Sequence, residues 1–183
     1  IYQCDWSSDV CSSDLGGDQA PGMVIRGLAI AHKRHPNAHF LVFGDEGVIA
    51  PLVRRRFKKS PHEIITIHHT AERVADTDKP SVALRAGRNT SMRLAIDAVA
   101  DGRAGGVISA GNTGALMAMS KMVLKTLDGI DRPAIASIVP TVRGEGVMLD
   151  LGANVQCDAQ NLVQFALMGD VFARTVLGLE KPS

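Results

Sequence analysis

Short apolar runs alternate with amphipathic segments along most of this 183-residue chain, and this alternation limits its fold more than any other feature. The apolar runs predict strands at residues 39–44, 63–69, 105–111, 133–140 and 146–152. The segments with helical spacing are residues 23–35, 46–57, 80–100, 112–127 and 159–177, the third of them interrupted around residues 87–90. Strands and helices that alternate through short loops predict an α/β fold, with a doubly wound, mostly parallel sheet covered by helices on both faces.

Composition narrows the function classes. The formal net charge is +1 and aromatic residues make up 4% of the chain, which argues against a nucleic-acid partner. The chain has no apolar run of about 18 residues and no basic-then-apolar leader, so we expect a cytoplasmic protein. Three cysteines without a CxxC pair and six scattered histidines predict neither a disulfide framework nor a metal site.

Residues 1–15 do not fit this pattern, because they have no helical or strand period. When CDWSSDVCSSDL is back-translated, one choice of codons resembles a common sequencing-adapter oligonucleotide. We therefore expect a non-native segment over residues 1–15 and a single α/β domain over residues 16–183. A disordered polar tail or a thiol pair stays open as the alternative.

In an open α/β sheet, ligands bind beyond the carboxyl ends of the strands, so loops there are the candidate sites. The run SAGNTGA leads from a predicted strand into a helix, where glycines and free N–H groups favour a phosphate or an oxyanion. Its candidate residues are Ser109, Gly111, Asn112, Thr113 and Gly114. An ordinary capped turn is the alternative interpretation.

Two further loops could share this edge of the sheet. In DLGAN, Asp150 could orient a donor or accept a proton, and Asn154 could hold an oxygen beside Gly152. A turn with locally satisfied side chains is the alternative. The third loop, with Gly16, Gly17 and Asp18, precedes the first helix.

Basic residues gather in two stretches. DKPSVALRAGRNTSMR brings Lys79, Ser81 and Arg85 near further arginines, and such a set could bind an anionic substrate, although a solvated helix face is the alternative. RRRFKK, residues 54–59, lies at a helix C-terminus, which favours solvated surface first and a docking site for an acidic protein second.

The motifs KPSxAxR, SAGNTGALMA, DLGAN and CDxxxLVQFAxMG, in this order, resemble the bacterial phosphate acyltransferase family of phospholipid synthesis, the PlsX family. The resemblance runs from residue 16 to about the end of the chain and covers about the first half of a family member. It implies a truncated fold like those of isopropylmalate dehydrogenase and phosphotransacetylase. It also implies an acyltransferase that moves a fatty acyl group from the phosphopantetheine thioester of acyl carrier protein to inorganic phosphate, with no cofactor.

The same resemblance implies roles for the candidate residues. Gly111, Asn112, Thr113 and Gly114 would hold phosphate or oxyanion, Lys79 and Arg85 would assist, Asp18 and Asp150 would orient these donors, and Asn154 would help fix the acyl phosphate. The partners implied are acyl carrier protein, a second copy of the full-length chain, and the inner face of the membrane through the missing half.

Two departures from the family pattern stand out. Ser13, Asp14 and Leu15 precede Gly16 where the family has Asp-x-Met, so we expect the first strand and its Asp to be replaced. The second half is absent, so we expect an inactive fragment. Two other classes stay open: a related enzyme on the same fold, such as a phosphotransacetylase or a dehydrogenase, the latter disfavoured because no GxGxxG follows a strand, and a non-catalytic module that binds phosphate or carrier protein.

Overall fold

The computed structural model describes residues 10–13, 20–58, 61–142, 144–154 and 156–182. Its contacts divide the chain into two compact units, residues 1–124 and residues 125–183. The first unit contains a parallel sheet and the second an antiparallel pair of strands.

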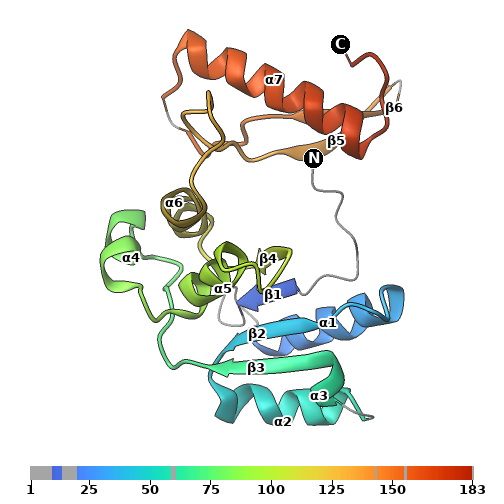
Figure 1. The fold of residues 1–183 in the computed structure, drawn as a ribbon, viewed down its shortest axis with the longest axis vertical. Helices are drawn as coiled ribbons and strands as arrows, with labels where there is room; N and C mark the ends of the chain where they lie inside the picture. The colour runs from blue at the N-terminus through green and yellow to red at the C-terminus, as the bar shows by residue number, and fades with distance from the viewer. Residues whose placement is uncertain (1–9, 14–19, 59–60, 143, 155, 183) are drawn as a thin grey trace. The chain divides into compact units, whose positions relative to one another are not determined.

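The first unit is built around four parallel strands in the order β3-β2-β1-β4 (Figure 1). The strands are β1 (Val10–Ser13), β2 (Phe40–Gly44), β3 (Ile65–His69) and β4 (Gly106–Ser109). The helices are α1 (Gly22–Arg34), α2 (Glu46–Arg56), α3 (Pro61–Ile64), α4 (Pro80–Ala86), α5 (Ser91–Ala100) and α6 (Thr113–Leu124). The predicted helices and strands of this unit are thus found close to their expected bounds.

Strand β2 shows why the sheet needs helices on both faces, because all five of its residues are buried. Phe40 and Val42 point to one face and pack in a cluster with residues of α1 and α2. Leu41 and Phe43 point to the other face and pack with alanines of α5. Figure 1 shows the same arrangement, with α1 and α2 on one side of the sheet and α5 on the other. The prediction of a doubly wound α/β fold is confirmed.

Strand β1 lies inside the segment that was expected to have no regular structure. It is a central strand, parallel to β2 on one side and to β4 on the other. The expectation that residues 1–15 contain no strand is therefore wrong for Val10–Ser13. A backbone that completes two hydrogen-bonded ladders does not require a strong strand pattern of side chains. The non-native origin of the segment stays a prediction.

The turn between α4 and α5 is held closely against its surroundings. The Thr90 hydroxyl donates to the Gly87 carbonyl over 2.8 Å, and the Thr70 hydroxyl donates to the Asn89 carbonyl over 2.6 Å. A Cβ at Gly87 would lie 2.3 Å from the Ala83 carbonyl oxygen and 2.7 Å from Met119 Cε. Only glycine fits there, so the turn has little freedom to shift.

The second unit consists of β5 (Ser137–Thr141), β6 (Gly144–Met148) and α7 (Ala159–Val176). Thr141 pairs with Gly144, so two residues connect β5 to β6, and the strands are antiparallel. DLGAN therefore follows a strand of the antiparallel pair and not a strand of the parallel sheet, so the reason for expecting it at that sheet's edge does not hold, and its place there stays a prediction. The two-residue connection is the physical reason for the antiparallel pairing, because a parallel crossover needs a dozen or more residues.

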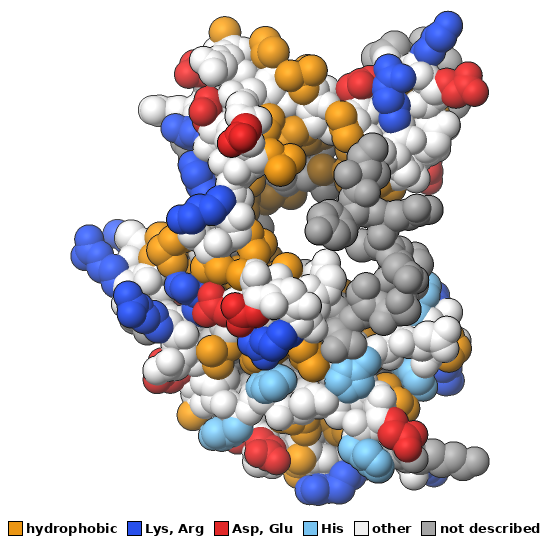
Figure 2. Space-filling view, viewed as in Figure 1, with side chains coloured by type: hydrophobic (Ala, Val, Ile, Leu, Met, Phe, Trp, Pro, Cys, Tyr) orange, Lys and Arg blue, Asp and Glu red, His pale blue; other side chains and the backbone are white. Residues whose placement is uncertain are grey.

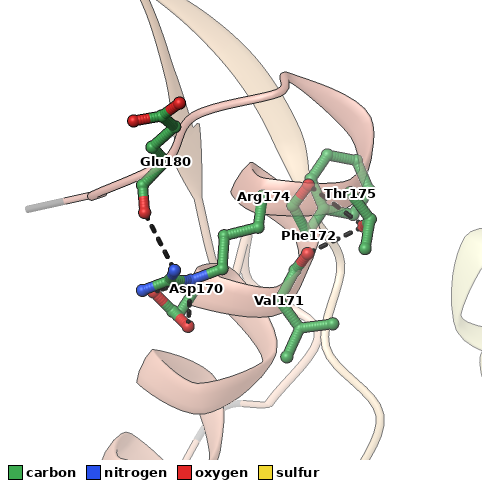
Figure 3. Close-up of polar contacts among 6 residues, drawn as sticks. All are labelled: Asp170, Val171, Phe172, Arg174, Thr175 and Glu180. Carbon is green, nitrogen blue, oxygen red and sulfur yellow. Dashed lines mark hydrogen bonds and ion pairs between the residues drawn. The ribbon is translucent and has the colours of Figure 1, made fainter.

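Hydrogen bonds fix both ends of α7. Asp158 and Asn161 form a reciprocal capping box at its start. At its end, Arg174 pairs with Asp170 over 2.9 Å and donates to the Glu180 carbonyl over 2.8 Å (Figure 3).

Large apolar side chains of α7 remain exposed: Leu162, Val163, Leu167, Val171 and Val176. The three buried hydrophobic clusters of the described residues all lie in the first unit.

We predict that Gly87→Ala lowers the free energy of unfolding by about 1 to 3 kcal/mol, because its methyl group would overlap backbone and Met119 atoms. Gly27→Ala is the matched control, since Gly27 is exposed within α1 with open space around it, and alanine there should add up to about 1 kcal/mol. Urea unfolding of both variants measures the difference. Equal stabilities would contradict the tight packing of this turn.

Candidate anion-binding site and the Asp150 loop

The parallel sheet has a topological switch point between β1 and β4. The chain leaves β1 toward β2 and β3 on one side, then returns to place β4 on the other side of β1. Ser13 and Ser109 are register partners, so both strands end at the same level. Ligands of open α/β sheets bind at such a point. The loop after β4 lies there, whereas Gly16, Gly17 and Asp18 lie outside the described residues.

The side chain of Asn112 joins this loop to a distant segment. Its Nδ2 group donates to the carbonyl oxygens of Ala75, Asp76 and Asp78 over 3.3, 3.2 and 2.8 Å. Its Oδ1 atom accepts from the Ala115 backbone N–H over 3.0 Å, which caps α6. Asn112 thus fixes the segment before α4 and the start of α6 together. Direct donation from its amide to phosphate or an oxyanion stays a prediction, and Nδ2 would have to release carbonyl partners for it.

Two backbone amides at the start of α6 remain available. The first amides of a helix lack partners within the helix, and here the cap satisfies Ala115 while the Asn112 carbonyl accepts from Leu116. Thr113 and Gly114 are exposed, and their N–H groups have no hydrogen-bond partner among the described residues. These two amides and the positive end of the helix can therefore accept an anion.

The start of α4 lies beside these amides. A Cβ at Gly114 would lie 3.1 Å from Pro80 Cγ, so the glycine allows α4 and α6 to begin close together. Lys79 is the N-cap residue of α4, and Ser81 lies in its first turn, both exposed. Arg85 lies one helical turn after Ser81 on the same face. The predicted Lys79 and Ser81 thus neighbour the Asn112 loop, with Arg85 further along.

Ser109 acts within the loop itself. Its hydroxyl oxygen accepts from the Gly111 N–H over 3.3 Å, which tightens the turn that leads from β4 to Asn112. The Gly111 amide is thereby engaged, unlike those of Thr113 and Gly114. The structure supports a local turn role for Ser109 and Gly111.

Asp150 and Asn154 form a separate hydrogen-bonded loop in the second unit. The Asp150 carboxylate accepts from the Ile135 N–H over 2.8 Å and from the Asn154 N–H over 2.7 Å. The Asn154 amide donates to that carboxylate over 3.1 Å and to the Pro133 carbonyl over 3.0 Å. Gly152 between them has φ +77°, a conformation that favours glycine. These contacts hold the loop against residues 133–135.

Burial alone would raise the pKa of the Asp150 carboxyl, but hydrogen bonds from the Ile135, Asn154 and Ala153 amides outweigh it and lower this pKa. A carboxylate with a lowered pKa in the folded state adds stability above its unfolded pKa. That stability is lost as the pH falls through the folded pKa. Asp150 is thus ionised and committed to its loop at neutral pH.

Sequence reasoning did not find the groups that Asn112 binds. They are backbone carbonyls of residues 75–78, and no side-chain pattern marks a carbonyl that a distant asparagine will contact. The Thr70 and Thr90 hydroxyls that hold the neighbouring turn were missed for the same reason. The sequence indicated a structural role only for Asn112, because an asparagine directly before a predicted helix is a favoured N-cap residue.

We predict that Asp150→Asn lowers the free energy of unfolding at pH 7 by about 1 to 3 kcal/mol, because one amide oxygen cannot replace both carboxylate oxygens. The loss should shrink as the pH falls below about 4 and on through the lowered pKa of Asp150, where the folded parent also loses its carboxylate. Asp128→Asn, at an exposed position of the same unit, is the control. A pH-independent difference between parent and Asp150→Asn would contradict this account.

Comparison with known proteins assigns the chain to a family. No described helix is long and apolar enough to cross a membrane. The chain is 63% identical over 169 residues to the phosphate acyltransferase of Rhodospirillum centenum, 57% to that of Rhodospirillum rubrum and 59% to that of Paramagnetospirillum magneticum. These matches cover 92% of this chain but only 47%, 48% and 48% of the relatives, so it spans about half their length. A family model described as "Fatty acid synthesis protein" matches residues 10–183, and the chain therefore belongs to this family.

Proposed function

We propose that the complete protein to which this chain corresponds is a phosphate acyltransferase, which transfers a fatty acyl group from acyl carrier protein to inorganic phosphate. The observation that carries the proposal is the 63% identity to a relative named phosphate acyltransferase, over 92% of this chain. The start of α6 at the switch point of the sheet supports it, because two free amides at a helix N-terminus suit an anionic reactant.

The proposed reaction balances without a cofactor. An oxygen of hydrogen phosphate attacks the thioester carbonyl carbon, and a tetrahedral oxyanion forms. The C–S bond then breaks, the new C–O bond joins acyl group to phosphate, and the proton from hydrogen phosphate ends on the pantetheine thiolate. The enzyme therefore has to bind an anion beside a thioester and stabilise the oxyanion.

The α6 start could serve either need. Holding both reactants in place can lower the activation free energy by about 7 to 11 kcal/mol. One hydrogen-bond donor to the oxyanion can lower it by about 2.7 to 4 kcal/mol. The N–H groups of Thr113 and Gly114 are the proposed donors, with Lys79, Ser81 and Arg85 as further phosphate contacts. Gly16, Gly17 and Asp18, beyond the end of β1, remain proposed members of the same site.

Asn112 acts in this proposal as a positioning residue, because its amide connects residues 75–78 to the first turn of α6. Asp150, Gly152 and Asn154 are proposed to shape their own loop, which in the family would help fix the acyl phosphate. A cytoplasmic location, a homodimer and peripheral membrane contact are proposed on the family resemblance alone.

A phosphotransacetylase-like activity is the second candidate, since it needs the same anion site. Turnover of acetyl coenzyme A at rates equal to those of acyl carrier protein thioesters would favour it. Binding of phosphate or carrier protein with no turnover by the complete protein would instead indicate a non-catalytic module and would contradict both enzymes.

We predict that Asn112→Ser in the complete protein lowers kcat/KM for phosphate at least tenfold and lowers the free energy of unfolding by about 0.5 to 3 kcal/mol, because the hydrogen bonds to the carbonyls of residues 75–78 are lost. Serine can still cap α6, but it is too short to reach the carbonyls of residues 75–78. Asn112→Ala should lose the same activity and about 1 kcal/mol more stability than Asn112→Ser, because it also removes the cap of α6.

The control is Asn37→Ser, at an exposed position between α1 and β2, which should keep acyl-phosphate formation within twofold of the parent. Asn112→Ser with the parent's kcat/KM would show that the carbonyl contacts of Asn112 do not serve the reaction. If the complete parent protein forms no acyl phosphate from acyl carrier protein thioesters or from acetyl coenzyme A, the proposed function is wrong.

A further inference from the structure

A cavity of about 410 Å³ lies where the end of α4, the start of α5 and the second half of α6 meet. Its lining residues are Leu84, Arg88, Arg93, Asp97 and Met122. All five belong to the first unit. The cavity therefore combines two cations, one anion and two apolar side chains.

The charges of the cavity are not balanced. Arg93 Nε donates to Asp97 Oδ1 over 2.8 Å, and this pair neutralises one cation. Arg88 is exposed and has no ion-pair partner within the part of the chain that the structure describes. Figure 2 shows Lys and Arg side chains gathered over α4, so the surroundings of the cavity also carry positive charge. An anionic oxygen is the ligand group that this imbalance favours.

The backbone that presents Arg88 is already rigid. Gly87 before it has no room for a side chain, and the carbonyl of Asn89 after it accepts from the buried Thr70. Thr90 closes the turn by bonding to the Gly87 carbonyl. A cation held on a fixed backbone loses less conformational freedom on binding, which favours recognition.

Apolar side chains adjoin the charge. Met122 is 41% exposed at the cavity, and Val82, on the neighbouring α4, is 51% exposed. Arginine and methionine are both enriched in protein–protein interfaces, where a cation lies beside desolvated apolar surface. A small free anion would leave this apolar surface unused.

The position of the cavity also suits a carrier of the thioester. Met122 follows Gly114 by eight residues in α6, a distance of about 12 Å along the helix axis. A protein docked at Met122 would thus sit outside the proposed reaction site, and its pantetheine arm would have to cover the distance. We propose that this cavity, with Arg88 as its anchor, docks the acidic acyl carrier protein, an inference that rests on the proposed function.

The test is titration of the 183-residue chain with acyl carrier protein by isothermal calorimetry at low salt. Arg88→Glu should weaken binding at least tenfold, and Met122→Glu should do the same by adding a negative charge at the rim. Arg55→Glu, in the basic run at the end of α2, should change binding by less than twofold. Circular dichroism checks that each variant is folded. If Arg88→Glu does not fold, the affinity of Met122→Glu for acyl carrier protein tests the proposal in its place.

The proposal is overturned if the parent chain does not bind, if Arg88→Glu and Met122→Glu both bind within twofold of the parent, or if Arg55→Glu weakens binding equally. A titration with carrier protein that lacks its phosphopantetheine identifies the anion that Arg88 binds. If its affinity equals that of the complete carrier protein, the anion is a carboxylate of the carrier. If affinity is lost, the anion is the phosphodiester of the phosphopantetheine. Both results support docking at the cavity.

Failure of this proposal differs from failure of the proposed function. In the complete protein, Arg88→Glu should raise the KM for the acyl carrier protein thioester at least tenfold and leave turnover of free acyl pantetheine unchanged. If the complete protein forms acyl phosphate but Arg88→Glu does not change the KM for the acyl carrier protein thioester, the docking site is overturned and the proposed function is not.

Discussion

The amide side chain of Asn112 is the interaction on which the candidate site depends. It ties three carbonyl oxygens of residues 75–78 to the first turn of α6. Each hydrogen bond contributes about 0.5 to 1.5 kcal/mol net, but together they fix where two helices begin. Asn112 caps the Ala115 amide, whereas the amides of Thr113 and Gly114 have no hydrogen-bond partner among the residues that the structure describes. One side chain therefore positions the candidate anion site.

The sheet determines where that side chain lies. Burial of β2 on both faces requires helices on both sides, and the return of the chain to β4 creates the switch point beside β1. Glycines then permit close approaches: Gly114 to Pro80, and Gly87 to Ala83 and Met119. The second unit follows a different principle, since the Asp150 carboxylate organises its loop through hydrogen bonds, and none of the three buried hydrophobic clusters of the described residues lies in this unit.

Much of the fold could be predicted because apolar periodicity reports directly on burial. The fully buried β2, the capped α6 and the break between α4 and α5 were all expected where they are found. Strand β1 could not be recognised, because its place in the sheet comes from backbone pairing with its neighbours. The antiparallel β5–β6 pair was missed although its two-residue connection excludes a parallel crossover. The carbonyl groups that Asn112 contacts could not be predicted, because no sequence pattern marks a backbone carbonyl that a distant side chain will bind.

The central claim is that the free amides at the start of α6 bind the phosphate. The most direct measurement is titration of the ¹⁵N-labelled chain with inorganic phosphate, followed by amide chemical shifts at constant ionic strength. The account predicts saturable shifts that are largest at Thr113 and Gly114. Shifts confined to other regions, such as the basic residues at the end of α2, with Thr113 and Gly114 unmoved, would contradict it.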